Sequence, residues 1–132
     1  MNTSTPFKNY RLLVVDDSDF ARAQISSLLT QLGFTVAGEA GNAEDALKQI
    51  REKKPHLVLT DIVMPNISGI ELAEKISQNF SQIGVMMISS LHHEQVVLES
   101  IAAGAIDFIR KPIDSIQLKE AVEKFLTTLG KE

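Results

Sequence analysis

The stretch His56–Asp61, with the sequence HLVLTD, is a short apolar run that ends abruptly in a carboxylate. Turn-forming residues bound it, with Pro55 in front and Met64-Pro65-Asn66 behind. A nearly continuous apolar run between turn signals is typical of a strand that is buried on both faces. Because such strands occur almost only in parallel sheets covered by helices, this stretch restricts the chain to an α/β architecture and puts Asp61 at a strand tip.

The rest of the chain alternates between strand and helix patterns. Strand patterns lie at residues 11–15, 34–38, 56–61, 83–88 and 105–110, and a helix pattern with one apolar face follows each of them. This alternation predicts a doubly wound, five-stranded parallel sheet with five helices, for which the strand order 2-1-3-4-5 is one of two common solutions. The weak alternation at 34–38 is expected for an edge strand.

The length, net charge and composition of the chain limit the functions that it can have. The 132 residues suit one domain, which we expect at residues 10–130 after a flexible tail at residues 1–9. The net charge of −4 argues against direct binding to nucleic acid or to an anionic membrane surface. The chain has no cysteine, no run near the roughly 18 apolar residues of a membrane span, and no signal-peptide pattern at its start. We therefore expect a cytoplasmic protein.

Polar side chains follow four of the five predicted strands. They are Asp16 and Asp17, Asp61, Ser89, and Lys111. The carboxyl ends of parallel strands share one edge of the sheet, and in the order 2-1-3-4-5 a crevice opens beside Asp61, where the chain reverses direction. Three carboxylates in that crevice would repel one another unless a cation lay among them, and oxygen-only ligands favour Mg²⁺.

These side chains have complementary chemical roles. Asp61 is placed to act as a nucleophile that accepts a phosphoryl group, while Asp16 and Asp17 hold the metal. Lys111 and the Ser89 hydroxyl can bind phosphoryl oxygens. Taken alone, the Asp16-Asp17-Ser18 run could be only a helix N-cap cluster, and its combination with Asp61 and Lys111 favours the functional interpretation.

Four motifs carry a resemblance to a known family. They are Val14–Ser18 (VVDDS), Leu59–Pro65 (LTDIVMP) with Ser68-Gly69, Ile88–Ser90 (ISS), and Phe108–Pro112 (FIRKP). In this order, and over nearly the whole domain, they resemble the receiver domain of bacterial response regulators, the family of the CheY-like chemotaxis switch proteins.

The resemblance implies a flavodoxin-like fold and phosphoryl transfer to Asp61 from a sensor histidine kinase or its phosphotransfer domain. It implies that Mg²⁺ is bound by Asp16, Asp61 and the backbone carbonyl of Val63, with help from Asp17. It also implies a cis peptide bond between Lys111 and Pro112.

Two departures from the family pattern concern switching and signal lifetime. Ser89 would swing towards the phosphoryl group, but the aromatic switch position is Phe108, which has no hydroxyl to report its orientation. The positions that tune dephosphorylation, two residues after Asp61 and two after Ser89, are Val63 and Leu91. Because neither side chain can orient an attacking water, we expect a long-lived acyl phosphate.

The family implies a partner face made by the fourth helix, the fifth strand and the fifth helix. It would bind a downstream protein target, and it could form a homodimer after phosphorylation. Several apolar residues lie there: Val96, Val97, Ile106 and Phe108.

Three alternatives stay open. The chain is also similar to the receiver half of chemotaxis methylesterases, so it could be a fragment of a larger regulator with a methylesterase or DNA-binding output. A magnesium-dependent aspartyl phosphatase would need a second carboxylate where Val63 stands. A scaffold without phosphorylation would not need the complete set of acidic, hydroxyl and ammonium groups.

Overall fold

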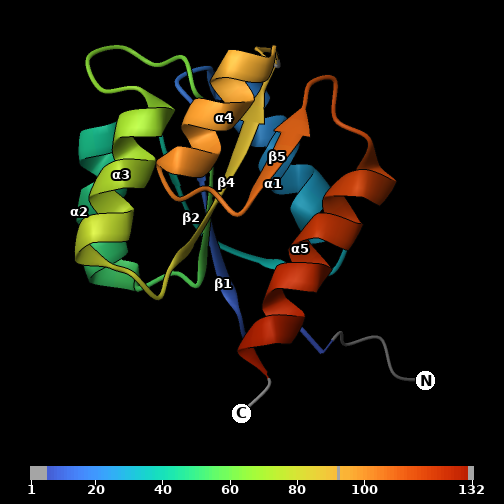
Figure 1. Cartoon of the computed structure of the whole chain (residues 1–132). Helices are drawn as coiled ribbons and strands as arrows, with labels where there is room; N and C mark the ends of the chain where they lie inside the picture. The colour runs from blue at the N-terminus through green and yellow to red at the C-terminus, as the bar shows by residue number, and fades with distance from the viewer. Residues whose placement is uncertain (1–5, 92, 131–132) are drawn as a thin grey trace.

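Five parallel strands form one sheet in the order β2-β1-β3-β4-β5 (Figure 1). The structure is a computed structural model and describes residues 6–91 and 93–130. The strands are β1 (Arg11–Val15), β2 (Thr35–Ala40), β3 (Leu57–Thr60), β4 (Gly84–Ser89) and β5 (Asp107–Arg110). The predicted topology and the edge position of β2 are confirmed.

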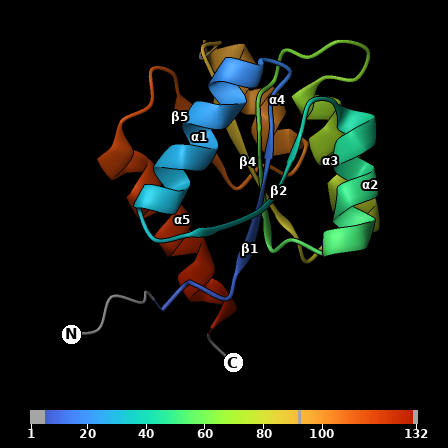
Figure 2. The ribbon, with the colours of Figure 1, turned by 180° about the vertical axis from the view of Figure 1, so that it is seen from behind.

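One helix follows each strand and packs on the sheet. The helices are α1 (Asp19–Gln31), α2 (Ala43–Lys53), α3 (Gly69–Asn79), α4 (Glu94–Ala102) and α5 (Ser115–Leu129). Helices α1 and α5 cover one face, and α2, α3 and α4 cover the other (Figures 1 and 2).

Alternate strand residues serve two separate cores. Leu13 and Val58 point to the side of α2 and α3, whereas Leu12 and Leu59 point to the side of α1 and α5. Every residue of β3 is buried, as its continuous apolar run predicted. Because both faces are covered, β3 is buried along its whole length, and Asp61 follows at its carboxyl end.

The strands β3 and β4 differ from their predicted ranges by one residue at each end, and the starts of β2 and β5 differ because preceding residues complete a helix. β2 begins at Thr35 and runs to Ala40, because the N–H of Phe34 donates to the Leu29 carbonyl and so belongs to the end of α1. β5 begins at Asp107, because Ala105 donates in the same way to the Ser100 carbonyl at the end of α4. The short loops after both helices contain glycines in the left-handed region, Gly33 at φ +98° and Gly104 at φ +108°.

Residues 6–9, which precede Tyr10 and β1, pack on the rest of the domain. Residues 6–9 form a turn, and the Phe7 ring lies 6.1 Å from the Phe34 ring and 6.5 Å from the Tyr10 ring. This part of the predicted flexible tail therefore packs on the α1–α5 core, since burying an aromatic ring stabilises the fold. Residues 1–5 of that tail lie outside the described residues.

Across residues 6–91 and 93–130, none of the helices has the length and apolar character that a membrane span requires.

Candidate functional site

Asp61 is held at the carboxyl edge of the sheet by its own backbone and by the loop that follows. Its N–H donates to the Val15 carbonyl of β1 at 2.9 Å, and its Oδ1 accepts from the Ile62 N–H at 2.7 Å. Gly69 then donates to the Ile62 carbonyl at 2.8 Å. A Cβ at position 69 would overlap the Asp61 carbonyl oxygen, so only glycine lets the loop lie this close. The Asp61 side chain is 14% exposed.

Asp16 follows β1 and is only 1% exposed. Each of its polar groups has a partner. Its N–H donates to Ala40 at 3.1 Å, Oδ1 accepts from the Ser18 N–H at 2.9 Å, and Oδ2 accepts from Lys111 Nζ at 3.1 Å. Its backbone carbonyl accepts from the Arg22 guanidinium at 2.7 Å. A buried carboxylate with this many donors is held in one orientation.

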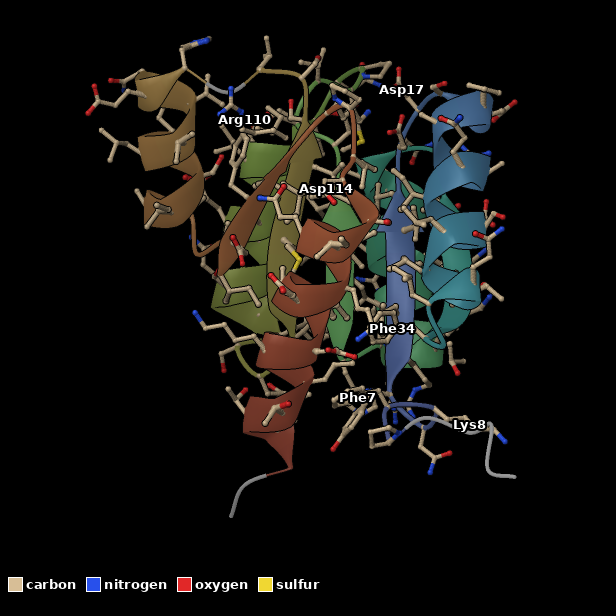
Figure 3. The ribbon with its side chains drawn as sticks, turned by 90° about the vertical axis from the view of Figure 1, so that its right-hand side faces the viewer. Phe7, Lys8, Asp17, Phe34, Arg110 and Asp114 are labelled. Atoms are coloured by element: carbon tan, nitrogen blue, oxygen red, sulfur yellow. The ribbon has the colours of Figure 1, made fainter. Side chains whose placement is uncertain are left out.

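The turn after Asp16 starts helix α1. Ser18, rather than either aspartate, is the N-cap, and its hydroxyl accepts from the Ala21 N–H at 3.2 Å. The two aspartates are therefore not needed as caps. Asp17 is exposed at the same edge of the sheet, far from Phe7 and Phe34 at the other end (Figure 3).

Lys111 reaches this site from the loop after β5. Its ammonium lies 3.1 Å from Asp16 Oδ2 and 3.4 Å from Asp61 Oδ2, and its side chain is 24% exposed. Its backbone N–H donates to the Ser89 carbonyl at 3.0 Å, which ties the loop to the end of β4. The peptide bond from Lys111 to Pro112 is cis.

Burial and charge act in opposite directions on these groups. Burial raises the pKa of the Asp61 carboxyl and the negative Asp16 adds to this, while the positive Lys111 only partly offsets it. Burial acts to lower the pKa of Lys111, but the hydrogen bond to Asp16 and the charge of Asp61 outweigh it, so that pKa is raised. Lys111 therefore stays protonated, and its single ammonium lies close to two carboxylates, those of Asp16 and Asp61.

The acidic residues fit a magnesium ion. Asp16, Asp17 and Asp61 each offer a carboxylate oxygen, and these oxygens lie within 4.8 Å of one another. Two oxygens bound to one Mg²⁺ at about 2.1 Å lie at most about 4.2 Å apart, so small side-chain rotations suffice. Three carboxylates against one ammonium leave excess negative charge, which a hard divalent cation would neutralise.

The other predicted site residues lie on the same edge. Ser89 ends β4 and is buried, and its hydroxyl accepts from the Leu91 N–H at 3.0 Å. Phe108, on β5, is half-buried against the core beneath α4. Val63 and Leu91 are exposed on the loops after β3 and β4.

Arg22 lies beside the acidic cluster and was not among the residues predicted from the sequence. Its guanidinium binds the Asp16 carbonyl, Asp19 and Glu39. A sequence signal existed, because a cation near the N-terminus of a helix opposes the helix dipole and so needs a specific reason.

Comparison with known proteins identifies relatives over nearly the whole chain. The family model of the response regulator receiver domain matches residues 12–123. The chain is 38% identical over 117 residues to the chemotaxis protein CheY of Bacillus subtilis, and the match covers 89% of this chain and 98% of that protein. It is 40% identical over 111 residues to a protein-glutamate methylesterase/protein-glutamine glutaminase of Bacillus licheniformis, covering 82% of this chain and 31% of that protein. A chain in the CheX-CheY-BeF3-Mg+2 complex from Borrelia burgdorferi matches with a TM-score of 0.82 and 29% identity, covering 94% of this chain and 92% of that chain.

Proposed function

Because the chain belongs to the family of response regulator receiver domains, we propose that it is a signalling switch in which Asp61 accepts a phosphoryl group. The observation that carries the proposal is the meeting of Asp16, Asp17, Asp61 and Lys111 in one pocket. These residues follow three different strands, β1, β3 and β5, whose carboxyl ends lie on one edge of the sheet.

The chemistry follows from the positions of the polar atoms. A carboxylate oxygen of Asp61 would attack the phosphorus atom of a phosphohistidine donor, while the bond from phosphorus to the imidazole nitrogen breaks and that nitrogen regains a proton. Asp16, Asp17, Asp61 and the Val63 carbonyl would hold Mg²⁺, which neutralises charge on the transferred group.

The Lys111 ammonium would change its binding partner when Asp61 receives the phosphoryl group. In the structure its ammonium is divided between Asp16 and Asp61. After transfer it would bind a phosphoryl oxygen, because a phosphoryl group brings about 1.5 to 2 negative charges to Asp61. The Ser89 hydroxyl would leave the Leu91 N–H to bind a second phosphoryl oxygen, and Phe108 would repack into the space vacated.

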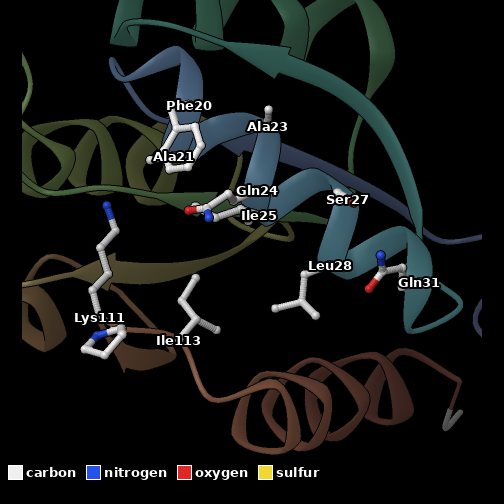
Figure 4. Close-up of a pocket in the computed structure, with 11 residues that line it drawn as sticks. Phe20, Ala21, Ala23, Gln24, Ile25, Ser27, Leu28, Gln31, Lys111 and Ile113 are labelled. Atoms are coloured by element: carbon white, nitrogen blue, oxygen red, sulfur yellow. The ribbon is translucent and has the colours of Figure 1, made fainter.

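The phosphodonor would be a histidine kinase or a phosphotransfer domain that docks beside the pocket. A groove lies between α1 and the loop after β5, and Lys111 lines one end of it next to Phe20 (Figure 4). The Phe20 side chain is 72% exposed, and Ile25, Leu28 and Ile113 extend the apolar lining. An apolar groove that leads to the ammonium suits a protein partner that carries the phosphoryl group.

The downstream target would bind a different surface, made by α4, β5 and α5. Leu98, Ile101 and Ile106 are about half exposed there, and Ile116 adds an exposed apolar side chain at the start of α5. Exposed apolar residues on neighbouring elements favour a protein interface, either with a target or with a second phosphorylated copy.

We propose a switch rather than a turnover enzyme. Val63, which is 59% exposed, stands where a phosphatase would need its second carboxylate, and Leu91 likewise cannot orient water. If these side chains set the lifetime, then Val63→Asn combined with Leu91→Glu should shorten the half-life of the phosphorylated protein. An unchanged half-life would contradict this assignment. The chain also matches a methylesterase over 31% of that protein's length. The alternative is therefore that the domain is the receiver part of a larger regulator.

Beryllofluoride with Mg²⁺ tests the proposal directly, since it mimics an acyl phosphate without turnover. We expect beryllofluoride to cause a stoichiometric change in the amide NMR spectrum of the wild type, and acetyl phosphate to leave phosphate covalently bound to it. Neither effect should occur in Asp61→Asn. Sustained phosphate release would support the phosphatase instead, and no response would support the scaffold.

A further inference from the structure

Arg22 makes three hydrogen bonds to parts of the chain that are separate in the fold. Nη1 donates to the Asp16 carbonyl at 2.7 Å, Nη2 donates to Asp19 at 2.6 Å, and Nε donates to Glu39 at 3.3 Å. The acceptors lie after β1, in the first turn of α1, and on β2. The Arg22 side chain is largely buried, so the guanidinium is clamped between these elements.

The bond to Asp16 orients the next residue as well. The N–H of Asp16 is tied to β2 through the Ala40 carbonyl, but its own carbonyl lies past the end of β1 and is bound by Arg22. The Asp16 carbonyl and the Asp17 nitrogen belong to one planar peptide group. Fixing this carbonyl therefore fixes the direction in which the chain enters Asp17. That matters because Asp17 is exposed, so packing does not hold its carboxylate.

The charge of Arg22 is compensated by two carboxylates outside the acidic cluster, those of Asp19 and Glu39. A guanidinium this close to Asp16 would weaken cation binding if it stood alone. Asp19 and Glu39 each pair with it, and together they offset its positive charge. Arg22 can thus hold the Asp16 carbonyl without strongly repelling a divalent ion.

We infer that Arg22 is a positioning residue of the magnesium site, which acts by orienting the Asp16–Asp17 peptide and thereby the Asp17 carboxylate. This inference rests on the proposed function, because it requires that the acidic pocket binds Mg²⁺. It assigns a role to a residue that does not itself touch the metal.

Titration calorimetry with Mg²⁺ on the unphosphorylated protein measures this role without any activity. Arg22→Met should weaken Mg²⁺ binding by about tenfold, the usual scale for a residue that supports a metal ligand. Arg22→Lys should be intermediate, since one ammonium can reach the Asp16 carbonyl but cannot also bind Asp19 and Glu39. The matched control is Arg51→Met in the last turn of α2, which should change affinity by less than about twofold.

A double-mutant cycle separates positioning from general damage to the fold. In an Asp17→Asn background, Arg22→Met should change Mg²⁺ affinity far less than in the wild type, because its route through Asp17 is gone. An equal loss in both backgrounds, or no loss in the wild type, would overturn the inference while leaving the proposed function intact. A wild-type protein that did not bind Mg²⁺ would refute the proposed function, and this inference with it.

Discussion

Replacing Lys111 by methionine should destabilise the protein in the absence of divalent cations and destabilise it much less in their presence. The substitution keeps most of the apolar stem of the side chain and removes only the ammonium. It leaves the nearly inaccessible Asp16 carboxylate without its cation, and Asp61 beside it. Mg²⁺ bound by the same carboxylates would replace the missing positive charge.

The magnitude follows from the two distances. At an effective dielectric constant of about 20, unit charges 3.1 and 3.4 Å apart attract by about 5 kcal/mol each. Much of this is offset, because the ammonium gives up its hydration on entering the pocket. Removing one partner of a buried ion pair costs about 3 to 5 kcal/mol, and the 24% exposure of Lys111 favours the lower value, about 3 kcal/mol. For a domain of this size that is a drop of roughly 10 °C in melting temperature.

Thermal unfolding followed by circular dichroism, in EDTA and in millimolar Mg²⁺, measures the effect. Lys119→Met is the matched control, since Lys119 pairs with Glu123 at 2.8 Å in a partly exposed pair on α5. That pair should contribute only about 0.3 to 0.5 kcal/mol. If Lys111→Met melted in EDTA within about 2 °C of the wild type, the ammonium would not be compensating the pocket and the electrostatic reasoning would be wrong.

Three further predictions concern stability. In the absence of Mg²⁺, Asp61→Asn should raise the free energy of unfolding by on the order of 1 kcal/mol at neutral pH. The reason is that burial raises the pKa of Asp61 and makes its charge unfavourable in the folded protein. Urea unfolding should show that this stability difference between the variant and the wild type shrinks as the pH falls through the raised pKa. Gly69→Ala should lower stability by about 1 to 3 kcal/mol through overlap with the Asp61 carbonyl, whereas Gly130→Ala, whose new Cβ would meet nothing closer than 3.6 Å, should not. Burial, and then the charge of Arg11, lower the pKa of His56, whose Nδ1 accepts from the Arg11 N–H at 2.9 Å. The stability that neutral His56 contributes is present above its ordinary pKa of 6.5 and is lost as the pH falls through the lower folded value. Between about pH 7.5 and about pH 5.5 the wild type should therefore lose more stability than His56→Asn, and equal losses would contradict this.

Local sequence patterns were sufficient to predict the architecture, because a strand that is buried on both faces consists almost entirely of apolar residues. The run before Asp61 could hardly be anything but a covered parallel strand, and β3 is buried throughout. Parallel strands share a carboxyl edge, so the topology alone predicts that Asp16, Asp61 and Lys111 lie close together. Their proximity in the structure follows from that rule.

Boundaries and supporting contacts were harder to predict. Ala105 looks like a strand residue, yet its N–H completes the end of α4 instead. Phe7 looked like part of a loose tail, yet it packs on Phe34. In both cases the deciding partner is a tertiary neighbour or a helix end, and the residue's own neighbours in the sequence do not specify it.

The amino-acid sequence by itself therefore determined the sheet, the helices that cover it and the edge where the acidic groups gather. Those depend on periodicity and on the geometry of parallel strands, which short stretches encode. The tertiary structure alone decided that Lys111 divides its charge between two carboxylates, that Gly69 must lack a side chain, and that Arg22 clamps the Asp16 carbonyl. Each of these is a contact of a few ångströms between separate elements, and such a contact depends on how the whole chain packs.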